Sequence, residues 1–120
     1  MEMKEQIQLR TKKLAIGIVR LCGMLPNTDP NKIISRQLIR ASCSVGANYR
    51  AVCRAKSPAD FINKLSIVEE EADESIFWLE LLGELETRFS ETISVNIRGM
   101  TEILSIVVAA RRTSKRKLQP

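Results

Sequence analysis

The fold is decided by residues 48–82, NYRAVCRAKSPADFINKLSIVEEEADESIFWLELL. Ser57-Pro58 divides this stretch, because Ser is favoured just before a helix and Pro is tolerated in its first turn. After that break, apolar residues recur at three- and four-residue steps, the spacing of one helix face. The resulting stripe consists of Phe61, Leu65, Val68, Ala72, Leu79 and Leu82, interrupted only by Ser75. Ile62, Ile76 and Phe77 widen it, so this helix needs more than one apolar neighbour.

Three other segments have the same period. The expected helices span residues 5–25, 31–56, 58–87 and 90–112, and the basic tail 113–120 is expected to fray. A chain of 120 residues is long enough for one domain, 1–120. Four helices of similar length with short connections bury such stripes best as an antiparallel up-down-up-down bundle. The sequence therefore predicts an all-α four-helix bundle.

The composition excludes several kinds of active site. Histidine is absent, so Ser-His-Asp and Cys-His catalysis and the Glu-x-x-His di-iron pattern cannot be built. Cys22, Cys43 and Cys53 form no Cys-x-x-Cys pair, and we expect reduced, at least half-buried thiols in the cytoplasm. Consecutive carboxylates of the run 69–74 point in different directions, whereas Glu69 and Asp73, one turn apart, could share an ion. We therefore expect no enzyme activity, no metal and no cofactor.

The longest apolar runs are also short. They cover residues 14–19 and 103–110, far below the roughly 20 residues of a membrane-spanning helix. No cleavable signal follows Lys12-Lys13, because Arg20 interrupts the apolar run after it. The sequence thus predicts a cytoplasmic protein without a membrane partner.

Charge is distributed unevenly along the chain. The formal net charge is +5, yet residues 60–86 hold nine carboxylates and a single base, Lys64. The other segments are therefore strongly basic. On the second expected helix, five cations fall within about 40° of one line at roughly 100° per residue. They are Lys32, Arg36, Arg40, Arg50 and Arg54. A second cluster, near the C-terminus, comprises Arg111, Arg112, Lys115, Arg116 and Lys117.

Two interpretations of the arginine row remain open. Its side chains are either solvated or paired with carboxylates of the acidic helix such as Glu69, Asp73, Glu80 and Glu84, as exposed charges on helices often are. Alternatively, the row binds phosphates, because the planar guanidinium fork matches phosphate oxygens. Few aromatic residues are free to stack on bases, so binding of RNA or DNA would be directed to the backbone and sensitive to salt.

Three blocks of the sequence resemble a family of bacterial four-helix-bundle proteins. The blocks are QLIRASCSVGANYR (37–50), AKSPADFINKL (55–65) and EADESIFWLELL (71–82). The family includes proteins encoded within intervening sequences of large-subunit ribosomal RNA genes and the accessory variability determinant of diversity-generating retroelements. The likeness extends from about Leu14 to Val108.

This resemblance implies an antiparallel bundle that assembles into a homopentameric barrel. For the retroelement members, it also implies a basic surface that engages RNA or DNA and a reverse transcriptase. Gln37 and Arg40 match the family's Gln-Leu-x-Arg element, and Arg50 matches the arginine after its Gly-Ala-Asn element. Ala51 stands where many relatives carry Glu, which leaves this surface more basic.

Two functions remain in competition. The first is a non-catalytic, oligomeric nucleic-acid-binding or scaffold protein, in its most concrete form an accessory subunit of a reverse transcriptase in a diversity-generating retroelement. The second is a structural, self-assembling interaction module without a nucleic-acid ligand, in which the arginines of one copy pair with the acidic helix of the next.

Overall fold

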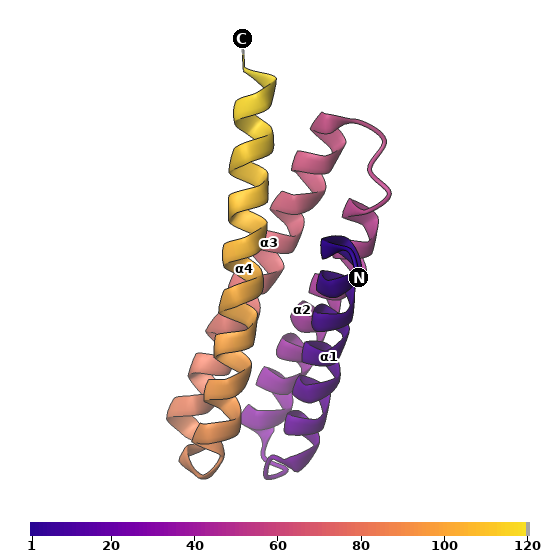
Figure 1. The fold of residues 1–120 in the computed structure, drawn as a ribbon. Coiled ribbons are helices and arrows are strands. Elements are labelled where there is room, and N and C mark those ends of the chain that lie inside the picture. Colours follow the sequence, from indigo (N-terminus) through magenta and orange to yellow (C-terminus); the bar gives the residue numbers. More distant parts are fainter. Residues whose placement is uncertain (120) are drawn as a thin grey trace.

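Four long helices account for nearly all of the chain in a computed structural model, which describes residues 1–119. The elements are α1 (Met3–Met24), α2 (Asp29–Val52), α3 (Pro58–Leu85), the short 3₁₀ helix η1 (Thr87–Phe89) and α4 (Ser90–Leu118). Consecutive long helices run in opposite directions and pack side by side (Figure 1). The molecule measures 52 × 27 × 20 Å. The predicted all-α four-helix bundle is confirmed.

Each helix buries one face in a common core. The predicted α3 stripe is confirmed at Leu65, Val68, Ala72, Leu79 and Leu82, which are all but inaccessible to solvent. The buried Ser75 hydroxyl donates to the backbone oxygen of Glu71 at 2.8 Å. Its polar group is therefore satisfied within its own helix and does not weaken the core.

Two helix ends differ from the prediction. Helix α2 ends at Val52, and residues 53–57 form the connection to α3. Helix α4 continues to Leu118, so the predicted frayed tail is wrong over 113–118, whereas Pro120 lies outside the described residues. Lys and Arg are good helix formers, and positive charge at a helix C-terminus is favourable. The basic composition of this segment therefore extends the helix.

A reciprocal cap fixes the start of α3. The Ser57 hydroxyl accepts from the Asp60 backbone N–H at 3.0 Å, while Asp60 Oδ2 accepts from the Lys56 backbone N–H at 3.0 Å. The Lys64 ammonium also donates to Asp60 Oδ2, at 2.7 Å. The contact with Lys64, followed by the Lys56 N–H, lowers the pKa of Asp60 below its usual value of 3.8. The cap holds the connection beside α2 in a defined shape.

Asp60 should therefore make stability depend on pH. Because its folded-state pKa is lowered, its contribution is present above pH 3.8 and is lost as the pH falls through the lower, folded-state value. We expect Asp60→Asn to be less stable than the natural protein at pH 7 and the difference to be smaller at pH 3. Urea unfolding followed by circular dichroism measures this, and a difference that is the same at both pH values contradicts it.

The opposite end of the bundle is tied by Asn31, which is 4% exposed. Its Nδ2 donates to the Pro26 backbone oxygen at 3.0 Å and to Glu86 Oε1 at 2.7 Å. These bonds join the α1–α2 connection to the α3–η1 connection. The two pairs of helices are thus held in register at this end.

One stretch of the described chain, Thr87–Leu118, is long and apolar enough to cross a membrane by length and composition. Four of its apolar residues, Ile93, Met100, Ile103 and Val107, pack into the core. A core helix of a soluble bundle meets the same criteria, so this finding does not by itself place α4 in a membrane.

Candidate functional site

The cations predicted on α2 fall into two groups. Lys32, Arg36, Arg50 and Arg54 are exposed and make no ion pair within residues 1–119, and Arg54 lies in the connection just after the end of α2. Arg40 instead lies against α3, where it donates to Glu71 Oε2 at 3.2 Å and to Glu74. Within the arginine row, only Arg40 is paired with carboxylates, and its partners are Glu71 and Glu74. The partners that the pairing interpretation named were instead Glu69, Asp73, Glu80 and Glu84.

The Arg40 pair is part of a small network. Trp78 Nε1 donates to Glu74 Oε2 at 3.0 Å, and this bond, with a smaller contribution from Arg40, lowers the pKa of Glu74. The bond to Glu74 in turn raises the pKa of Arg40. Arg40 therefore fastens α2 to α3, and a phosphate would have to displace two carboxylates to reach it.

The C-terminal cations also divide. Arg111 is half-buried and pairs with Glu69, with Nε–Oε2 at 2.5 Å and Nη2–Oε1 at 3.3 Å, and this contact raises the pKa of Arg111. Glu69, one of the two carboxylates placed to share an ion, is thus engaged by a guanidinium. The remaining predicted cations of the cluster, Arg112, Lys115, Arg116 and Lys117, are exposed on the last turns of α4.

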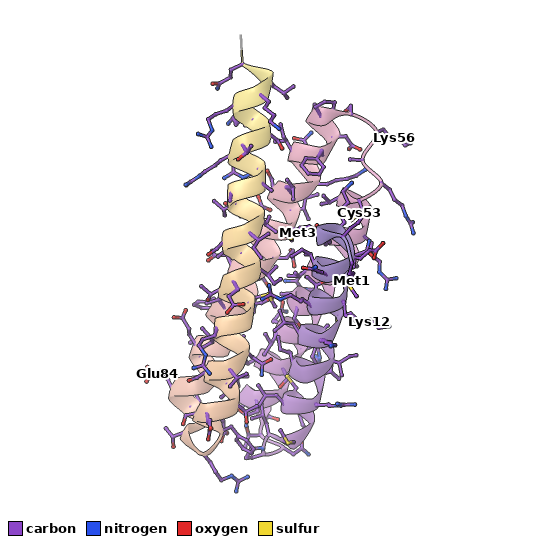
Figure 2. All side chains as sticks on the ribbon, viewed as in Figure 1. Met1, Met3, Lys12, Cys53, Lys56 and Glu84 are labelled. Carbon is purple, nitrogen blue, oxygen red and sulfur yellow. The ribbon has the colours of Figure 1, made fainter. Side chains whose placement is uncertain are left out.

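An open groove of about 640 Å³ lies between α1 and α2 and reaches the α2–α3 connection. We call it the cationic groove. Its charged lining residues are all basic: Lys12, Arg50, Arg54, Lys56 and Lys64. Lys64 pairs with Asp60, whereas the other four are exposed and make no ion pair in the described part of the chain. Figure 2 shows Lys12 and Lys56 projecting on the same side of the molecule.

Small side chains form the floor of the cationic groove. Thr11 and Ala15 of α1 face Gly46 and Ala47 of α2. A Cβ built on Gly46 would lie 3.5 Å from Thr11 Oγ1, so the two helices approach closely here. Cys43 also lines the groove and is exposed, contrary to the expectation of an at least half-buried thiol. Its place on the outward line of α2 accounts for this.

Sequence reasoning found Arg50 and Arg54 but missed Lys12, Lys56 and Lys64. These lysines lie on α1, the connection and α3, and only Lys64 is the single base of its segment. Only the packing of three elements brings them together. The one available signal was Lys56, which directly precedes Ser57-Pro58 and follows Arg54 by two residues, because a connection often lies beside the end of the preceding helix.

Few aromatic side chains are available to stack on a nucleic-acid base. Tyr49 is 7% exposed, and burial raises its pKa to about 12. Trp78 is half-buried and engaged with Glu74. Phe77 is 51% exposed, but it lies on α3 and does not line the cationic groove. The groove can thus contact an anion through charge and small apolar surface without aromatic stacking.

Charge separates along the bundle axis. The α2–α3 connection and the C-terminal end of α4 lie at the same end, which also holds the Arg54 and Lys56 side of the groove (Figure 1). The second half of α3 runs toward the other end and carries Asp73, Glu80 and Glu84, which make no ion pair within residues 1–119. One end of the molecule is therefore basic, while α3 is acidic toward the other.

These features define a four-helix-bundle protein with one strongly cationic end. The chain matches the family described as 23S rRNA-intervening sequence protein over residues 3–109, and it belongs to that family. A crystal structure of a protein of unknown function from the S23 ribosomal protein family of Bacteroides thetaiotaomicron is similar, with a TM-score of 0.80 and 35% sequence identity. The similarity covers 88% of this chain and 97% of that one. No curated protein matches the chain.

The family membership inferred from residues 37–50, 55–65 and 71–82 is thus confirmed. The further likeness to retroelement accessory proteins has no counterpart in these matches and stays a prediction. Neither the family description nor the solved relative names a catalytic activity.

Proposed function

We propose that this protein is a non-catalytic scaffold that binds the phosphate backbone of RNA or DNA at the cationic end of the bundle. The observation that carries the proposal is the cationic groove, where Lys12, Arg50, Arg54 and Lys56 converge with no carboxylate among the lining residues. Clustered like charges repel one another, and a nucleic-acid backbone supplies compensating negative charges at regular spacing.

The exposed cations of α4 extend this surface. Arg112, Lys115, Arg116 and Lys117 lie on a helix that projects beyond its neighbours (Figure 1). A strand held in the cationic groove has a second set of charges within reach at the same end of the molecule. Because Arg40 and Arg111 are engaged by carboxylates, we assign them a structural role in place of phosphate binding.

Salt dependence tests the proposal. Four phosphate contacts on a single strand predict a slope of about −3 in log affinity against log salt, or a loss of about 50-fold between 50 mM and 200 mM salt. Fluorescence anisotropy with a labelled single-stranded RNA measures the affinity, and native mass spectrometry records the oligomer over the same range. An affinity independent of salt, or no binding at low salt, would contradict the proposal.

A self-assembling module is the second candidate, and exposed apolar residues favour it. Ile33, Phe77 and Leu85 are more than half exposed, at 61%, 51% and 57%. Together with the unpaired carboxylates of α3, they provide a surface that a second copy can cover. Under this function alone, high salt weakens the ion pairs between subunits, and no RNA binds at any salt concentration.

Self-assembly and nucleic-acid binding are compatible. We therefore propose a homo-oligomer, a pentamer by the family resemblance, whose subunits each present a cationic groove. A reverse transcriptase as protein partner remains a prediction from that resemblance alone.

A further inference from the structure

The shape of the cationic groove limits what can enter it. Its walls are α1 and α2, and packed helices stand about 8–10 Å apart, axis to axis. A double helix, whose grooves alone are about 6 and 12 Å wide, is too broad to lie between them. A single strand is narrow and flexible enough to follow such a furrow.

The lining of the groove is chemically divided. Four of its five basic side chains are exposed, whereas Ala15, Cys43, Gly46 and Ala47 contribute a small, largely apolar surface. A nucleotide has the matching division, with an anionic phosphate on one side and a flat, less polar sugar and base on the other. A volume of about 640 Å³ is within the range of sites that hold small organic ligands.

We propose that the cationic groove binds one nucleotide unit of a single strand, with its phosphates on Lys12, Arg50, Arg54 and Lys56 and its sugar or base against the small floor. The protein is accordingly selective for single-stranded over double-stranded nucleic acid. This inference rests on the proposed function and adds to it the form of the ligand and the place where it is held.

Base identity matters little in this site. The Thr11 hydroxyl already donates to the Gln8 backbone oxygen at 3.0 Å, which leaves the Gln8 amide as the principal neutral hydrogen-bonding group of the lining. One amide cannot distinguish four bases. The preference is therefore for strandedness and charge, and sequences without secondary structure bind alike.

Filling the floor without altering charge tests the inference. Ala47 is exposed on α2 and lines the groove, so Ala47→Phe places a ring where the nucleotide lies and leaves every cation in place. The matched control is Ala109→Phe, the same change at an exposed position of α4 that is outside the groove and close to the other basic surface. Helicity measured by circular dichroism checks both folds.

The ligands are an oligouridylate of about 12 nucleotides and an RNA duplex of the same length, a size that suits known single-strand sites. We expect the natural protein to prefer the single strand by about 10-fold, and Ala47→Phe to remove that preference by weakening single-strand binding alone. Uridine monophosphate should compete better than inorganic phosphate, because the floor contacts the nucleoside. Equal competition by the two would mean that only charge is recognised and would overturn the inference.

Cys43 provides a second readout that needs no variant. It is exposed in the groove, whereas Cys22 and Cys53 are half-buried. Trypsin releases the three cysteines in separate peptides, because arginine or lysine residues stand between them. The single strand should protect Cys43 from N-ethylmaleimide at least about 10-fold more than the duplex does at equal occupancy.

The outcomes distinguish failure of the nucleotide site in the groove from failure of the proposed function. If Ala47→Phe binds the single strand as the natural protein does and Cys43 is not protected, the groove is not the nucleotide site, although backbone binding elsewhere stands. If neither single strand nor duplex binds the natural protein at low salt, the proposed function itself fails.

Discussion

Replacing both Arg50 and Arg54 with glutamate should lower the affinity for single-stranded RNA by at least about 100-fold. Hydrogen bonds to a charged group contribute about 1.5–3 kcal/mol each, and every 1.4 kcal/mol is a factor of ten in affinity. Losing two such contacts therefore accounts for the expected change, and the new carboxylates add repulsion. Both arginines are exposed and make no ion pair in the described chain, so the bundle should fold normally.

The control must separate local from overall charge. Arg20 and Arg98 are exposed, lie outside the cationic groove and make no ion pair within residues 1–119. The double change Arg20→Glu with Arg98→Glu alters the net charge equally. We expect it to weaken binding by less than about 5-fold at 150 mM salt, where screening acts over roughly 8 Å. Equal losses in the two double variants would mean that the protein attracts RNA by net charge without a defined site.

Leu82→Ala should be the most destabilising of the changes considered, at about 3 kcal/mol. Leu82 is wholly inaccessible in the core, and truncating a buried leucine removes apolar contacts and leaves a cavity. Leu85, three residues further along α3, is 57% exposed, so Leu85→Ala should cost less than about 0.5 kcal/mol. Chemical unfolding followed by circular dichroism measures both.

This pair of leucines also reports on assembly. The two variants remove the same atoms from the same helix and differ only in the burial of the side chain. A loss of several kcal/mol in Leu85→Ala that depends on protein concentration would mean that another copy covers this residue in solution. Such a result would favour the self-assembling function, whereas a small and concentration-independent loss leaves that surface free.

The fold was largely predictable because it depends on local patterns. The stripe from Leu65 to Leu82 follows one helix face, and Ser57-Pro58 marks a helix start that the reciprocal cap with Asp60 confirms. The ends of α2 and α4 were less predictable. The basic composition after Arg112 looked like a solvated tail, yet the same residues are good helix formers and sit favourably at a helix C-terminus.

The candidate site was only partly predictable because it is assembled from separate elements. A helical wheel placed Arg50 and Arg54 on one outward line, although Arg54 lies just beyond the end of α2. The wheel could not predict that Arg40, on the same line, lies within reach of Glu71 and Glu74. It also could not predict that Lys12 of α1 lines the opposite wall of the cationic groove. That information depends on which helices are neighbours and on their register.

The separation of charge along the bundle makes the molecule an electric dipole. In the electric field of a polyanion, such a rod-shaped molecule is oriented before contact, so that its basic end faces the polyanion and encounters occur end-on. Orientation of this kind raises the association rate constant and makes it fall with ionic strength, independently of any change in the lifetime of the complex. The acidic second half of α3, including the exposed Glu80 and Glu84, then points away from the polyanion.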